Sequence, residues 1–240
     1  QRDYAKERPV NDEVFKIYQS LFSYDKAALE ARSESAEEKD ERWHREKVSF
    51  TAAYGGERMS AVILSPKNFP PPHQAVIYFP GSGAIAQRST DRLDRIDLAT
   101  LLVGSGRAVV FPIYKGTYDR GDGLITTYPE PTSSYRDHVI YWSKDLGRTI
   151  DYLETRKDIQ ADKLAFMGIS WGGRMGSMLP ALENRIKVVV LGSGGFRPQT
   201  TLPQVDQINF VPRVTVPVLM VNGRYDFLFP VESGQLPMFR

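Results

Sequence analysis

Residues 163–178, KLAFMGISWGGRMGSM, decide the fold of this chain. Residues 164–167 form a short apolar run typical of a buried strand, and apolar residues recur at helical spacing over 171–182. Between the two lies Gly168-Ile169-Ser170-Trp171-Gly172, a G-x-S-x-G sequence. A strand that turns directly into a helix strains the residue between them, and its neighbours must be small because other elements pass close by. The pattern predicts that Ser170 is held at the carboxyl edge of a sheet, near the positive end of a helix, as a nucleophile would be.

The rest of the chain alternates between strand and helix patterns. Further strands are predicted at residues 48–54, 59–64, 75–79, 108–111, 187–191 and 216–221, and further helices at 93–102 and 139–153. The first two strands flank Gly55-Gly56 and predict a hairpin. Strands separated by helices imply an α/β fold with a mostly parallel central sheet and helices on both faces.

The first 45 residues differ in character from the remainder. They are polar and charged and show no strand pattern, so we expect residues 1–45 to be a helical or charged extension or linker. Residues 46–240 are then the α/β domain. Residues 114–131 and 192–212 are rich in Gly, Pro and polar residues and are predicted to be loops.

Composition excludes several function classes. The 31 Lys and Arg residues nearly balance the 29 Asp and Glu residues, and no basic stripe favours nucleic acid or a membrane surface. No apolar run approaches the ~18–20 residues of a membrane helix, and no signal peptide is visible, so a cytoplasmic location is expected. The chain has no Cys, which excludes thiolate chemistry, and its three scattered His make a zinc site improbable. No metal or cofactor is expected.

A serine nucleophile needs a base and an orienting carboxylate. Asp226 follows the carboxyl end of the strand predicted at 216–221, where open α/β sheets place their sites, and is our candidate acid. The alternative for Asp226 is that it only caps a turn. Glu232 is the second candidate and is expected to be surface.

The turn after the strand at 75–79 is our candidate oxyanion hole. Gly81, Ser82 and Gly83 let backbone N–H groups approach a ligand, and the amide of Trp171 is the second expected donor because it follows the nucleophile. An ordinary tight turn is the alternative. Side chains that could line a substrate pocket, or belong to the core, are Tyr114, Trp171, Phe196, Phe210 and Phe229.

The general base is missing from the expected place. No His follows Asp226. His138 lies at a predicted helix start, His73 enters a strand from the opposite edge, and His44 belongs to the charged N-terminal region. We expect structural or surface roles for all three.

The Gly168–Gly173 segment, Asp226 behind Gly223, and Pro80-Gly81-Ser82-Gly83 together resemble an α/β-hydrolase. The likeness covers about residues 46–235 and is greatest to the branch of dienelactone hydrolases, acetyl xylan esterases and prolyl oligopeptidase-like proteins. It implies that Ser170 is the nucleophile, Asp226 the orienting acid and a later His the base. Because that His is absent, we expect the C-terminal portion of the domain to be missing, so that the remainder of its own chain is a partner of these residues.

The resulting prediction is a serine carboxylic-ester hydrolase that acts on a small-molecule ester through an acyl-enzyme on Ser170. Two alternatives stay open. One is a prolyl oligopeptidase-like peptidase, although no propeller repeat is visible. The other is a non-catalytic hydrolase-like binding domain of a larger multidomain protein, which the absent His favours.

Overall fold

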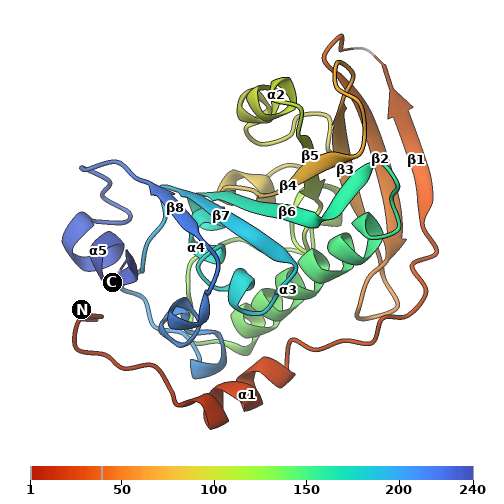
Figure 1. The fold of residues 1–240 in the computed structure, drawn as a ribbon. Coiled ribbons are helices and arrows are strands. Elements are labelled where there is room, and N and C mark those ends of the chain that lie inside the picture. Colours follow the sequence, from red (N-terminus) through yellow and green to blue (C-terminus); the bar gives the residue numbers. More distant parts are fainter. Residues whose placement is uncertain (1, 39, 240) are drawn as a thin grey trace.

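An eight-stranded sheet forms the centre of the computed structural model, which describes residues 2–38 and 40–239 (Figure 1). The strands are β1 (Arg32–Glu37), β2 (Trp43–Thr51), β3 (Arg58–Pro66), β4 (His73–Phe79), β5 (Ala108–Pro112), β6 (Ile159–Ile169), β7 (Ile186–Gly192) and β8 (Val218–Val221). Their order in the sheet is β1-β2-β3-β5-β4-β6-β7-β8. The pairs from β1 to β5 are antiparallel and all pairs from β5 to β8 are parallel, so the predicted hairpin and the mostly parallel sheet are confirmed.

Helices cover both faces of this sheet, and β4 shows how. Its side chains alternate between the faces, as the two-residue period of a strand requires. Ile77 and Phe79 join the apolar cluster of α3 (Ser133–Leu153), whereas Tyr78 joins the opposite cluster with α2 (Ile96–Gly104). An uninterrupted apolar run is therefore needed in β4, because both of its faces are buried.

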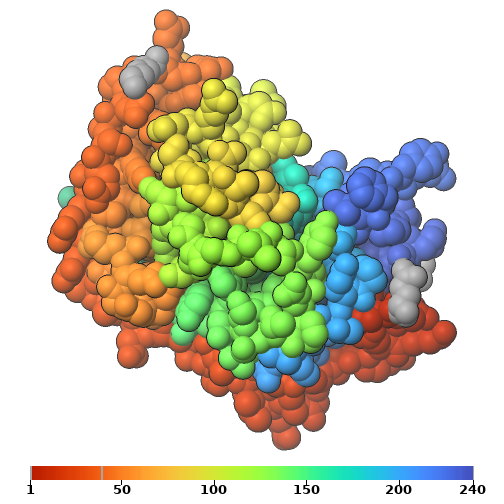
Figure 2. All heavy atoms as spheres, turned by 180° about the vertical axis from the view of Figure 1, so that it is seen from behind, coloured from red at the N-terminus to blue at the C-terminus, as the bar shows by residue number. Residues whose placement is uncertain are grey.

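The N-terminal region departs from the expectation. The predicted helix is present as α1 (Asp12–Ser20), but the expectation of no strand in residues 1–45 is wrong, because β1 and the start of β2 lie there. β1 is polar and exposed on both faces, so it has no apolar alternation to find; it is held by main-chain pairing with β2. Residues 4–9 of the N-terminal segment lie beside residues 232–239 near the C-terminus, and both line one groove (Figures 1 and 2).

The helix after Ser170 is shorter than its apolar pattern suggests. α4 spans only Trp171–Met175, and a separate 3₁₀ turn, Leu179–Ala181, follows. After Met175 the backbone bonds tighten, with the Ser177 N–H donating to the Arg174 carbonyl and the Met178 N–H to the Met175 carbonyl, and Pro180 has no N–H with which to resume an α-helix. The last helix, α5 (Leu236–Phe239), is a single turn. Within the described residues no helix is both long and apolar enough to cross a membrane.

An ion-pair group fastens the end of α3 to the sheet. Arg156 contacts Asp158 at 2.7 Å and Glu46 of β2 at 2.6 Å. The hydrogen bonds from the Arg156 guanidinium hold the pKa of Asp158 below its ordinary value of 3.8. Stability from this pairing is thus present above pH 3.8 and is lost as the pH falls below it.

Candidate active site

Ser170 occupies the strained turn that joins β6 to α4. Its backbone has φ 58° and ψ −108°, in the left-handed half of the map that residues other than glycine rarely adopt. The turn is fixed from both sides: the Ser170 N–H donates to the Gly192 carbonyl at 2.9 Å, and the Arg174 N–H donates to the Ser170 carbonyl at 3.0 Å. The hydroxyl is therefore presented at the carboxyl end of β6 and the N-terminal end of α4.

The glycines beside Ser170 are required by close backbone contacts. A Cβ on Gly168 would lie 2.2 Å from the carbonyl oxygen of Gly172, and one on Gly172 would lie 2.1 Å from that of Phe79. Both separations are far below any real Cβ contact. The G-x-S-x-G spacing thus has the physical cause inferred from the sequence.

A small cavity of about 40 Å³ opens beside Ser170. It gathers the serine turn, the turn after β4, the loop at 114–131 and the loop after β8 at one edge of the sheet. Its lining residues are Ser82, Thr127, Tyr128, Ser170, Trp171, Arg174, Arg197, Leu228 and Phe229.

The candidate oxyanion donors are not equivalent. The Gly81 N–H already donates to the Asp94 carboxylate at 2.8 Å, and the Tyr78 hydroxyl donates to the same oxygen at 3.0 Å. Ser82 lines the cavity, whereas Gly83 does not. The indole of Trp171 is buried in the aromatic core. The candidate oxyanion donor at this residue is therefore its main-chain N–H, at the start of α4.

Asp226 lies in the loop after β8 and caps its turn. One carboxylate oxygen accepts from the N–H groups of Leu228 and Phe229, at 2.9 and 3.0 Å. The turn-capping alternative is thus realised, and the two capped residues are those that line the Ser170 cavity. Glu232 lies elsewhere, on a larger groove.

None of the three histidines, all of which lie in the described part of the chain, lines the Ser170 cavity. His44 contacts Glu38 at the surface. His73 is buried at the start of β4, far along the sheet from the carboxyl ends. His138 contacts the Asp122 carboxylate at 3.0 Å from α3. The described residues therefore supply no imidazole to Ser170.

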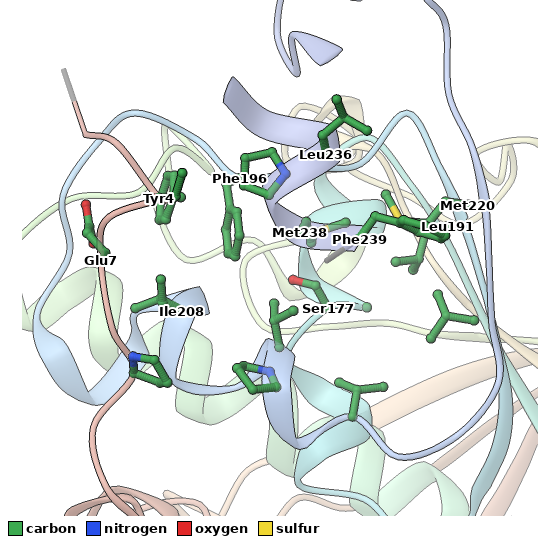
Figure 3. A pocket seen from close by; sticks show the side chains of 18 of the residues that line it. Tyr4, Glu7, Ser177, Leu191, Phe196, Ile208, Met220, Leu236, Met238 and Phe239 are labelled. Atoms are coloured by element: carbon green, nitrogen blue, oxygen red, sulfur yellow. The ribbon is translucent and has the colours of Figure 1, made fainter. Parts of the chain in front are cut away.

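The aromatic residues predicted to line a pocket fall into different environments. Phe229 lines the Ser170 cavity. Tyr114 and Phe210 are fully buried in the core, where Tyr114 stacks on Phe79. Phe196 stacks on Tyr4 and lines a separate apolar groove of about 670 Å³ between the N-terminal segment, β8 and α5 (Figure 3).

Two arginines at the site were not identified from the sequence. Arg174 of α4 and Arg197 of the loop after β7 are both buried and both line the Ser170 cavity. Arg174 donates to the Tyr135 hydroxyl and the Thr127 carbonyl. Burial raises the pKa of Tyr135, although Arg174 opposes the shift, so this hydroxyl stays neutral. Nothing in the sequence around Arg174 or Arg197 distinguishes them from surface arginines.

The loop that carries Thr127 and Tyr128 is anchored by a buried charge. Asp145 of α3 contacts Arg120 at 2.7 Å and accepts from the Lys115 N–H at 2.9 Å. Burial raises the pKa of Asp145, and Arg120 opposes the shift. Residues 2–38 and 40–239 contain no cluster of three or more His, Asp or Glu able to hold a metal ion.

The sheet order, the helices on both faces and the serine turn after β6 define an α/β-hydrolase fold. No family model matches the chain. Among solved structures it is similar to acetyl xylan esterase 1 from Thermoanaerobacterium sp. JW/SL YS485, with a TM-score of 0.72 over 97% of this chain and 84% of that chain, at 16% identity. A cold-adapted esterase from an Arctic intertidal metagenomic library gives a TM-score of 0.60 over 90% and 83%, at 20% identity.

One curated protein is similar in sequence, "Putative hydrolase YtaP" of Bacillus subtilis (strain 168). It is 27% identical over 147 residues, which are 57% of this chain. The match spans about half of the length of that relative, 48%.

Proposed function

We propose that the chain carries the nucleophile of a serine carboxylic-ester hydrolase, with Ser170 forming an acyl-enzyme. The observation that carries the proposal is the strained Ser170 turn, which opens into a cavity at the carboxyl edge of the sheet. Strained backbone persists where the surrounding structure imposes it and is concentrated at functional sites. The esterases among the similar solved structures support the same reaction class.

In the proposed reaction the Ser170 oxygen attacks the ester carbonyl while a base accepts its proton. The tetrahedral oxyanion takes hydrogen bonds from the amides of Trp171 and Ser82, since the Gly81 amide is already engaged. Collapse of the intermediate expels the alcohol, which receives the proton. Water then attacks the acyl-enzyme and releases the acid.

The base is an imidazole that we propose comes from outside these 240 residues, because no described histidine lies at Ser170. The second oxygen of Asp226 would orient that imidazole, while its first oxygen caps the turn. One alternative is favoured by an observation, a non-catalytic binding domain, since such a domain would also lack an imidazole beside Ser170.

Covalent labelling separates the two. In the full natural polypeptide that contains these residues, a fluorophosphonate probe should label Ser170, and Ser170→Ala should abolish both labelling and ester hydrolysis. Ser193→Ala is the matched control, because Ser193 also has a positive φ, 47°, at a strand end. The labelling rate should rise with pH around the ordinary imidazole pKa of about 6.5. Labelling of another residue, or none at all, would contradict the esterase.

A further inference from the structure

Two guanidinium groups that pair with no carboxylate of the described residues line the same small cavity as Ser170. Arg174 is 3% exposed and Arg197 is 8% exposed. Neither forms an ion pair with any carboxylate in the part of the chain that the structure describes, residues 2–38 and 40–239. Buried charges in proteins are ordinarily paired, because desolvation penalises an isolated charge. The two positive charges at the Ser170 cavity therefore lack the anionic partner that is usual for buried charges.

The contacts of Arg174 hold it in place without neutralising it. Its two terminal nitrogens donate to the neutral Tyr135 hydroxyl and Thr127 carbonyl. Asp206 lines an adjoining cavity together with Arg174, but its carboxylate forms an ion pair with Arg2 at 2.9 Å. Arg174 is thus fixed as a cation at the wall of the cavity.

Arg197 is fixed in a similar way and also has an unused donor. One of its terminal nitrogens donates to the Leu228 carbonyl at 2.8 Å. The guanidinium lies 4.6 Å from the ring centre of Tyr128 and 5.6 Å from that of Phe229. Its Nε is buried and has no hydrogen-bond partner among the described residues. Because Nε is enclosed by protein atoms, the donor open to a ligand acceptor is the other terminal nitrogen, Nη2, which also forms no hydrogen bond among the described residues.

We propose that Arg197, supported by Arg174, forms an anion subsite that selects esters carrying a carboxylate close to the scissile carbonyl. The inference rests on the proposed role of Ser170. A guanidinium binds a planar carboxylate through a fork of N–H groups, and charged hydrogen bonds are stronger than neutral ones. The cavity of about 40 Å³ admits only a small group, so the carboxylate must lie within a few bonds of the carbonyl that Ser170 attacks.

The kinetic test uses neutral and anionic esters of equal shape in the full natural polypeptide. Monomethyl succinate is compared with methyl 4-methylpentanoate, and acetoxyacetate with isobutyl acetate; in each pair an isopropyl group replaces the carboxylate. From the strength of charged hydrogen bonds, kcat/KM should favour the anionic member by about tenfold or more in at least one pair. Arg197→Met should remove that preference, and Arg197→Lys should retain part of it.

Arg213→Met is the matched control. Arg213 also lies over an aromatic ring, 4.1 Å from the centre of Phe15, and donates to main-chain carbonyls, but it does not line the Ser170 cavity. Its replacement should leave the anionic-to-neutral ratio unchanged. An equal kcat/KM within both pairs, or a preference that survives Arg197→Met, would overturn the subsite.

Binding distinguishes failure of the subsite from failure of the esterase. Calorimetric titration with succinate should show binding to the wild type and to Ser170→Ala, weakened about tenfold or more in Arg197→Met. Hydrolysis of both members of each pair without a charge preference would retain the esterase and reject the subsite. Succinate binding that depends on Arg197, without hydrolysis of any ester, would retain the subsite and reject the esterase.

Discussion

Glycine at position 170 should be at least as stable as alanine there, while both substitutions remove the proposed nucleophile. The residue is held at φ 58° and ψ −108°, a conformation that costs a residue with a Cβ about 1–3 kcal/mol. Glycine removes this cost but makes the unfolded chain more flexible, which offsets about 0.4–1 kcal/mol. The net expected gain in the free energy of unfolding, relative to Ser170→Ala, is therefore about 0–2.6 kcal/mol.

The comparison with Ser170→Ala isolates the backbone, because both variants lack the hydroxyl. Urea denaturation followed by circular dichroism measures the difference, and the dependence on urea should be equal in the two variants. For a chain of this size, about 1 kcal/mol corresponds to a shift of about 2–4 °C in Tm. Both variants should be inactive and unlabelled by fluorophosphonate.

Ser105 supplies the control for this prediction. It also lies at a helix end, but at an ordinary φ of −94°. There the glycine variant should be less stable than the alanine variant by about 0.4–1 kcal/mol, because only the unfolded-chain effect remains. If glycine is destabilising relative to alanine at Ser170 by the same amount as at Ser105, the backbone of the serine turn stores no strain and the reasoning fails.

Three further outcomes are expected. Gly172→Ala should lower the free energy of unfolding by more than about 3 kcal/mol, because its Cβ would lie 2.1 Å from a main-chain oxygen and the backbone must move. Gly83→Ala has no atom within 4 Å of the added Cβ and should change the free energy of unfolding by less than about 0.5 kcal/mol. Urea titrations measure both. Asp226→Asn should lower kcat by about 10⁴ with little effect on Tm, whereas Asp226→Ala should lower both kcat and Tm. Glu232→Gln should change neither quantity. A kcat near that of the wild type in Asp226→Asn would exclude Asp226 as the acid. Asp158→Asn should flatten the loss of stability below about pH 4, since the pKa of Asp158 is depressed by its arginine partner. An unchanged pH profile would show that other groups govern acid unfolding.

The parts of the fold that the sequence predicts are those whose cause is local. The apolar run of β4 needs no partner to be recognised, and the serine turn is marked by glycines whose contacts lie within a few residues or on the adjacent strand. β1 escapes prediction because a polar edge strand is held by main-chain bonds to β2, which leave no pattern in its side chains.

The anion subsite could not be predicted, because its character comes from residues far apart in the sequence. Arg174 is followed by apolar residues, and Arg197 stands between Phe196 and Pro198. Arg197 is buried by contacts with Tyr128 and the Leu228 carbonyl, and Arg174 by contacts with Tyr135 and the Thr127 carbonyl. Charge without a partner is a property of the assembled cavity, and no window of sequence contains it.

Asp226 has two carboxylate oxygens, so capping a turn is compatible with its proposed role as the orienting acid. Its first carboxylate oxygen caps the turn at Leu228 and Phe229, and the Leu228 carbonyl in turn accepts from Arg197. The cap thus supports the position of the Arg197 guanidinium at the Ser170 cavity, and the second oxygen is the one that the proposed imidazole would contact. Asparagine keeps an oxygen for the cap but loses the charge, and alanine loses both. The Asn variant therefore reports on the orientation of the base, and the difference between Asn and Ala reports on the structural cap that supports the anion subsite.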